Sequence, residues 1–145
     1  MGRHKLYVCD SGLAAHLARL STDQLDPTQD PRPAGALVES FVLAELTRQT
    51  GWSREPVQLY HYRDRNGPEA DIVLAHRDGR VAALEIKAGM SIGDNAFRTL
   101  RLLRDRLADR FVAGLVLYTG ERALSFGDRL AAIPIEALWH LEAAA

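Results

Sequence analysis

Two short acidic motifs stand thirteen residues apart near the middle of the chain. The first reads Glu69-Ala70-Asp71 and the second reads Glu85-Ile86-Lys87. Carboxylate oxygens are the ligands that hard divalent cations prefer, and an ammonium group can stabilise the negative charge that develops on a phosphate. If the two motifs lie side by side, they predict a site where a metal ion and a lysine act together on a phosphodiester.

The sequence between the motifs predicts a β-hairpin that would bring them together. Strand-like runs at 72–74 and 81–84 flank a turn signal at 77–79. If the loop has three residues, with its glycine in the left-handed conformation, Asp71 lies directly opposite Glu85. A two-residue Asp-Gly loop would shift the register by one and place the two carboxylates on opposite faces. The metal interpretation therefore requires the odd-length loop or a compensating bulge.

Alternation along the strands divides the hairpin into two faces. Lys87 shares the face of Asp71 and Glu85, because side chains repeat with a period of two. The other face is predicted to belong to the core, since its members are all apolar: Ala70, Ile72, Leu74, Ala82, Leu84 and Ile86.

The same charges have a structural interpretation that competes with the functional one. Glu69 opposes Lys87 in this register, and a surface ion pair contributes only about 0–1 kcal/mol. Two features favour a site. Opposed carboxylates at Asp71 and Glu85 repel each other unless a cation lies between them. Only two of the 18 basic residues are lysines, Lys5 and Lys87, so the choice of a compact ammonium here is unusual for this chain.

A third carboxylate comes from an upstream helix predicted over 34–49. The helical neighbours of Glu39 are small or apolar, and a carboxylate in such a stripe is costly unless it is paired or bound to a metal. Three interpretations stay open: Glu39 binds a metal, extends out to solvent, or pairs with a buried arginine such as Arg63. Glu45, in contrast, is predicted at the solvent edge of this helix, next to Arg48.

The order of a helix Glu, an Asp and a Glu-x-Lys resembles the PD-(D/E)XK nuclease-like superfamily. More closely, the chain resembles the uncharacterised C-terminal domain found behind the ATPase module of many bacterial and archaeal AAA-type ATPases. Ala70 stands where the name motif of the superfamily has proline. The resemblance covers most of the chain and is carried by five segments: 5–13 (KLYVCDSGL), 35–46 (GALVESFVLAEL), 60–63 (YHYR), 69–74 (EADIVL) and 84–89 (LEIKAG).

The resemblance implies specific roles for these residues. Asp71 and Glu85 would bind Mg²⁺ or Mn²⁺, Glu39 would be a supporting acid in the metal site, and Lys87 would be the catalytic lysine of a nuclease that hydrolyses DNA. It also implies a AAA ATPase module as partner, in cis or in trans, and leaves open that the chain is a C-terminal fragment of a larger ATPase. The alternative is a non-catalytic module with a nuclease fold that regulates an ATPase or binds protein or nucleic acid.

The composition limits what other functions the chain can have. One cysteine and no histidine pair at ligand spacing argue against a zinc site. The net charge of −1 provides no overall attraction for DNA, so contacts must come from local patches. The candidates are Arg63, whose strand parity points it toward the acidic cluster, and Arg98 and Arg101, one turn apart on a predicted helix. A solvated helix face is the alternative for the last two.

The element pattern predicts one domain over 1–145 with an α/β fold. It is a restriction-endonuclease-like sandwich in which helices flank a central mixed sheet, with an α-β-β-β-α-β core. A flexible loop is predicted over 21–34, and the absence of a signal peptide and of a long apolar run predicts a cytoplasmic protein without a membrane segment. Strands are predicted at 4–9, 57–63, 111–118, 122–126 and 130–135, helices from Asp10 or Ser11 to about Leu20 and from Ser91 or Asp94 to about Asp109, and a final packing turn at 138–139.

Overall fold

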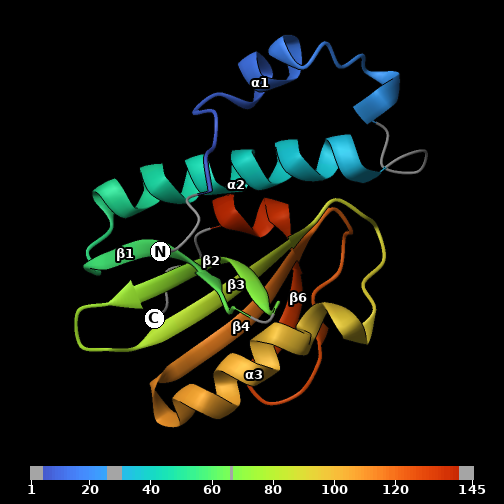
Figure 1. Ribbon diagram of the computed structural model, residues 1–145. Coiled ribbons are helices and arrows are strands. Elements are labelled where there is room, and N and C mark those ends of the chain that lie inside the picture. Colours follow the sequence, from blue (N-terminus) through green and yellow to red (C-terminus); the bar gives the residue numbers. More distant parts are fainter. Residues whose placement is uncertain (1–4, 26–30, 66, 141–145) are drawn as a thin grey trace.

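A six-stranded mixed sheet forms the middle layer of the protein, with helix α2 on one face and helix α3 on the other (Figure 1). The computed structural model describes residues 5–25, 31–65 and 67–140, without the side chains of residues 31 and 32. The arrangement confirms the predicted α/β sandwich. The elements are α1 (Ser11–Leu17), α2 (Pro31–Trp52), α3 (Arg98–Leu107), β1 (Val57–Arg63), β2 (Glu69–His76), β3 (Val81–Lys87), β4 (Phe111–Tyr118), β5 (Leu124–Ser125) and β6 (Leu130–Pro134), with short 3-10 turns η1 (Asp23–Leu25), η2 (Asp94–Phe97), η3 (Ala108–Arg110) and η4 (Ile135–Trp139).

The strand order across the sheet is β1-β2-β3-β4-β6-β5. Strands β1 to β3 pair antiparallel, whereas β4 runs parallel to both β3 and β6. A parallel pair needs a crossover, and α3 provides the one between β3 and β4. The chain order α2-β1-β2-β3-α3-β4 therefore matches the predicted core.

The β2–β3 hairpin has the predicted register. Val73 pairs with Ala83, and the ladder continues to Ala75 opposite Val81. The loop contains three residues, and Gly79 takes φ +92°, the left-handed conformation that this turn requires. Within this ladder, from Ile72 to Ala75 and from Val81 to Leu84, side chains that were expected on one face therefore do share it.

Each face of the sheet carries its own hydrophobic cluster. On the α2 side, Val42 and Leu46 pack against Ile72 and Leu84. On the α3 side the cluster is built around three buried residues of that helical region and β4: Phe97, Leu100 and Phe111.

Ala70 was predicted to share the face of Ile72 and Leu84, which is the α2 face, but it packs with the α3 cluster instead. The pairing of β1 with β2 shifts between Tyr60, opposite Val73, and Tyr62, opposite Ala70. Such a bulge increases the local twist of the strand. Alternation therefore predicts the faces correctly only as far as the bulge.

The N-terminal part differs from the expectation. Residues 5–9 form no strand, and the predicted first residue of that strand, residue 4, lies outside the described part of the chain. Asp10 caps α1 as predicted, by accepting the backbone N–H of Leu13 at 2.7 Å. Helix α1 ends at Leu17, short of the predicted Leu20, and lies on the side of α2 that faces away from the sheet, with none of its residues buried (Figure 1).

The predicted loop over 21–34 is partly structured. Residues 21–25 include η1, and α2 begins at Pro31, three residues earlier than expected; residues 26–30 lie outside the described ranges. Proline is tolerated in a first helical turn because its missing N–H would have no partner there. The two prolines at 31 and 33 were therefore compatible with a helix start.

Glu45 is buried rather than at a solvent edge, with 8% of its surface exposed. The reason is η4, which packs on α2 so that Gln49 donates to the carbonyl of Leu138 at 2.8 Å. Hydrogen bonds from Arg48 and Gln49 satisfy the Glu45 carboxylate and lower its pKa. Glu45 thus has a structural role.

The remaining elements agree with the pattern. Strands β1 and β4 have the predicted bounds, β5 and β6 are shorter than predicted, and the predicted second helix divides into η2, α3 and η3. None of the described helices has the length and apolar character needed to cross a lipid bilayer.

Candidate functional site

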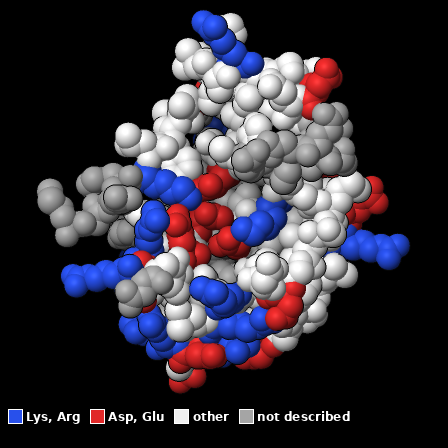
Figure 2. Space-filling model, turned by 45° about the vertical axis from the view of Figure 1, so that its right-hand side comes forward, with Lys and Arg blue, Asp and Glu red and all other residues white. Residues whose placement is uncertain are grey.

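A hollow of about 790 Å³ opens where the ends of β2 and β3 meet α2 and the start of α3. Acidic side chains gather inside it and basic ones stand around it (Figure 2). Four carboxylates from three elements line the hollow: Glu39, Glu69, Asp71 and Glu85. Such a concave site with converging charged groups is where binding and catalysis are expected.

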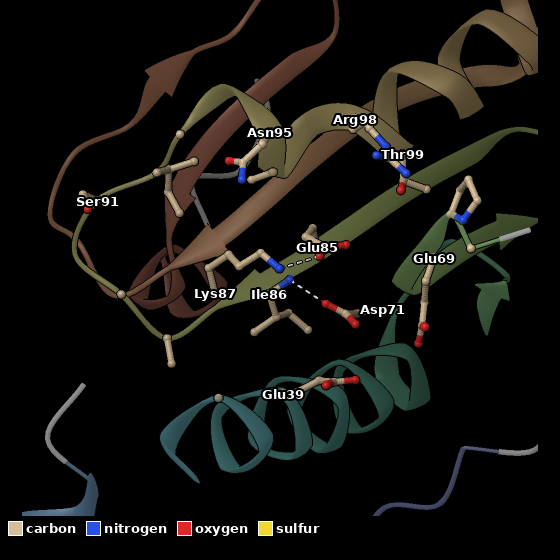
Figure 3. A pocket seen from close by; sticks show the side chains of 18 residues that line it. Glu39, Glu69, Asp71, Glu85, Ile86, Lys87, Ser91, Asn95, Arg98 and Thr99 are labelled. Carbon is tan, nitrogen blue, oxygen red and sulfur yellow. Dashed lines mark hydrogen bonds and ion pairs between the residues drawn. The ribbon is translucent and has the colours of Figure 1, made fainter. Parts of the chain in front are cut away.

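The hairpin positions Asp71, Glu85 and Lys87 at this hollow (Figure 3). The backbone N–H of Ile86 donates to Oδ2 of Asp71 at 2.9 Å, which fixes this carboxylate beside β3. Lys87 Nζ donates to Oε1 of Glu85 at 2.6 Å. Burial raises the pKa of Glu85, and the neighbouring charge of Asp71 raises it further. Asp71 is therefore close enough to disfavour the charge of Glu85.

Glu39 reaches the same hollow from α2 (Figure 3). Its side chain is 19% exposed, so it neither extends into bulk solvent nor enters the apolar core. It also does not pair with Arg63, whose Nε lies 3.7 Å from Oε2 of Glu69. Both structural interpretations of Glu39 from the sequence were therefore wrong.

Lys5 is the site residue that the sequence reasoning missed. Its ammonium group forms an ion pair with Glu39 and lies 3.2 Å from Oδ1 of Asp71 and 3.4 Å from Oε1 of Glu69. Burial opposes the charge, but the hydrogen bonds to Glu39 and Tyr7 and the charge of Asp71 outweigh it, so the pKa of Lys5 is raised. One signal was available in the sequence, the rarity of lysine in this arginine-rich chain. The structure shows that both lysines lie at the acidic cluster.

Tyr7 reinforces this contact from the same N-terminal segment. Its hydroxyl donates to Oε1 of Glu39 at 2.5 Å. Burial, followed by the hydrogen bond to Glu39, raises the pKa of the Tyr7 hydroxyl, which therefore stays protonated as a donor.

The donor set fits a hard cation by chemistry. All the candidate ligands are carboxylate oxygens, as Mg²⁺ and Mn²⁺ require. In this arrangement, however, lysine ammonium groups hold those oxygens, and within the described ranges no three Asp, Glu, His or Cys side chains are placed to share one ion. Asp71, Glu85 and Glu39 are the residues that would hold a metal.

The three candidate arginines occupy different environments. Arg63 stands at the rim, beside Glu69. Arg98 lines the hollow, and its guanidinium forms no hydrogen bond or ion pair with any described residue. Arg101 is held away from the hollow by Asp94, which it contacts through both terminal nitrogens, and it lies over the ring of Phe97.

Comparison with known proteins gives a family. The model of the family described as "Domain of unknown function (DUF4143)" matches residues 34–138. The chain belongs to this family. The matched part of the DUF4143 domain runs from α2 to η4, so it contains Glu39, Asp71, Glu85 and Lys87 but not Lys5.

Other comparisons give less. No curated protein matches this chain. Among solved structures, a chain from the tetradecameric assembly of Thermococcus gammatolerans McrB AAA+ hexamers with bound McrC aligns with a TM-score of 0.47 and 11% sequence identity. The alignment covers 85% of this chain and 39% of that one, so the domain spans less than half the length of its structural neighbour.

Proposed function

We propose that this DUF4143 domain is a Mg²⁺-dependent nuclease, also active with Mn²⁺, that hydrolyses DNA phosphodiester bonds. One observation supports it most: Glu39 on α2, Asp71 on β2, and Glu85 and Lys87 on β3 converge in one hollow. Charges that only solvate a surface have no reason to converge there, and both burial and the charge of Asp71 raise the pKa of Glu85. Clusters of acidic side chains that raise the pKa of one of their members are typical of functional sites.

Each residue has a role that follows from its position. Asp71 and Glu85 would hold the ion, with Glu39 as the supporting acid. A bound ion would lower the pKa of a coordinated water and neutralise charge on the scissile phosphate. The ammonium of Lys87 stabilises the charge that develops on the phosphate oxygens. The attacking water loses a proton to solvent as its oxygen bonds to phosphorus, the P–O bond to the sugar breaks, and the leaving oxygen accepts a proton from solvent.

Arg98 is the group best placed to position the DNA. It lines the hollow with no partner among the described residues, so its guanidinium is available to a phosphate. Arg101 is already satisfied by Asp94, which makes it the weaker candidate. Arg63, beside Glu69, can add a contact at the rim.

A second candidate function is a non-catalytic module of nuclease fold that serves a AAA ATPase in cis or in trans. The observation that favours it is the Lys5 ammonium, which forms ion pairs with both Glu39 and Asp71 and so offsets part of their charge. The sequence resemblance to the domain behind AAA-type ATPase modules supports the partner. In this case the acidic cluster would bind a basic group of a partner protein.

The experiment is a titration of Mg²⁺ or Mn²⁺ with two readouts, the thermal midpoint of unfolding and the cleavage of supercoiled plasmid. Lys87→Ala and Asp71→Asn are the inactive controls. We expect cation-dependent nicking by the wild type and none by either variant. Stabilisation by metal without cleavage would support the non-catalytic module, and a protein that responds to neither ion in either readout would exclude the nuclease.

A further inference from the structure

The N-terminal segment 5–9 places a cation of the chain's own among the acidic side chains. Lys5 Nζ contacts Glu39 on α2 and both Asp71 and Glu69 on β2. These contacts use Oδ1 of Asp71 and Oε1 of Glu39. Those oxygens belong to two of the three carboxylates that would have to turn toward a divalent ion.

We propose that Lys5 and a divalent cation are alternative occupants of this site, so that segment 5–9 is an autoinhibitory arm that leaves when the metal binds. The inference rests on the proposed metal-dependent function. It concerns the order of events before catalysis: the apo domain is held closed by its own lysine, and metal binding opens it.

The arm is attached in a way that permits release. Among the described residues, no backbone group of 5–9 takes part in a hydrogen bond, and no strand pairing holds this segment to the sheet. Leu6 is 91% exposed, and Val8 and Cys9 are exposed as well. The side chains of Lys5 and Tyr7 provide its contacts with the acidic cluster, so the arm belongs to the part of the molecule that opens locally at low cost.

Release of Lys5 alone is unfavourable, which couples the arm to the metal. Without the ammonium, Glu39, Glu69 and Asp71 would face each other with uncompensated charge. A second cation removes that penalty. Because an ion can shift the equilibrium only through its preference for the open state, occupancy of the site by Lys5 weakens the apparent metal affinity.

The first test measures Mn²⁺ binding by the electron paramagnetic resonance signal of free Mn²⁺. If Lys5 fills the site in nine-tenths or more of the molecules, Lys5→Met lowers the apparent Kd about ten-fold or more. Arg54→Met removes an equal charge from an exposed position that does not line the hollow and should leave the Kd unchanged. Asp71→Asn should lose binding.

Tyr7→Phe provides a variant that does not alter the charge. It removes the hydroxyl that holds Glu39 and keeps the ring. We expect tighter Mn²⁺ binding than in the wild type, by a smaller factor than for Lys5→Met. This variant also keeps the test valid if Lys5→Met, with its uncompensated carboxylates, fails to fold.

The second test follows the arm itself. Cys9 is the single cysteine and is exposed, so a nitroxide can be attached there without other changes. Diamagnetic Mg²⁺ should make the nitroxide spectrum of the wild type more mobile, whereas labelled Lys5→Met should be mobile before Mg²⁺ is added.

The outcomes separate the two proposals. Equal Mn²⁺ affinity of the wild type, Lys5→Met and Tyr7→Phe, or a Cys9 label that Mg²⁺ leaves unchanged while the ion binds, overturns the autoinhibitory arm and leaves the metal-dependent nuclease intact. Absence of Mn²⁺ binding in every folded variant overturns the proposed function, and the arm with it.

Discussion

The β2–β3 hairpin carries charges at both of its ends, and the partners of these charges differ between the two ends. At the turn, Asp78 accepts the backbone N–H of Arg80 at 2.9 Å and pairs with its Nε at 2.7 Å, while His76 lies 2.7 Å from the same carboxylate. Every partner is within two residues. At the open end, Asp71 and Glu85 face a cluster whose counter-charges come partly from the distant Lys5.

The two ends also differ in the sign of their effect on protonation. The backbone N–H of Arg80, followed by His76 and the Arg80 side chain, holds the pKa of Asp78 well below its usual range. Burial and the charge of Asp71 raise the pKa of Glu85. Ionised Asp78 therefore stabilises the fold, whereas ionised Glu85 costs stability. The charge of Asp78 is compensated by neighbouring residues and stabilises the turn. The charge of Glu85 is clustered with others at an energetic cost, as is typical of a binding site.

The largest expected effect is on cleavage. Asp71→Asn should reduce Mg²⁺-dependent plasmid nicking by at least about 100-fold, since a charged group aimed at the reaction is removed. Asp78→Asn makes the same chemical change at the other end and should alter the rate less than about two-fold, because surface substitutions far from a site have small effects. Comparable losses in the two variants would remove the distinction between the ends.

The next effect concerns DNA binding by two arginines of α3. It compares Arg98, whose guanidinium has no partner among the described residues, with Arg101, which is paired with Asp94. Arg98→Gln should weaken binding of duplex DNA several-fold and reduce the slope of log K against log salt by about 1, as expected for one lost phosphate contact. Arg101→Gln, whose guanidinium is bound to Asp94, should change neither. Fluorescence anisotropy over a salt series measures both, and a reversed order of the two variants would reject Arg98 as the contact.

A smaller effect is expected on stability without metal. Glu85→Gln keeps an oxygen that can accept from Lys87 and removes the costly charge, so the apo protein should unfold at a higher urea concentration than the wild type at neutral pH. Cleavage should be lost in the same variant. Urea unfolding in EDTA measures the gain, and a destabilised variant would mean that the Glu85–Lys87 pair is structural.

The smallest effect is an acid-dependent one at the turn. Because the folded-state pKa of Asp78 is depressed, its stabilisation is present at neutral pH and disappears as the pH falls from about 4 downward. The wild type should therefore melt slightly above Asp78→Asn at pH 7, and the gap should narrow progressively as the pH falls below about 4. A gap that is independent of pH would argue that Asp78 acts through its shape and not its charge.

Much of the hairpin was predictable because its signals are local. Gly79 and the three-residue turn fix the register, and alternation then assigns each side chain to a face. The exception, Ala70, follows from a bulge in β2 itself, where two residues, Asp71 and Ile72, lie opposite the single residue His61 of β1. The alternation of residue types along β2 does not reveal this bulge.

The contacts of Lys5 and Glu45 were not predictable from local patterns. Lys5 lies 66 positions from Asp71, in a segment without periodicity. Glu45 is covered by a turn whose Leu138 lies 89 positions from Gln49. Alternation and helical stripes describe which face a residue occupies on its own element, but they carry no information on which distant segment covers it.

The most direct test of the account is a crystal of the protein soaked in Mn²⁺, with an anomalous difference map recorded near the manganese absorption edge. We predict a peak between Asp71 and Glu85, roughly 2.0–2.5 Å from oxygens of both, as is usual for hard cations on carboxylates. We also predict that Lys5 has moved away from that peak. A map without density there, or with manganese only beside Asp78 at the turn, would contradict the account.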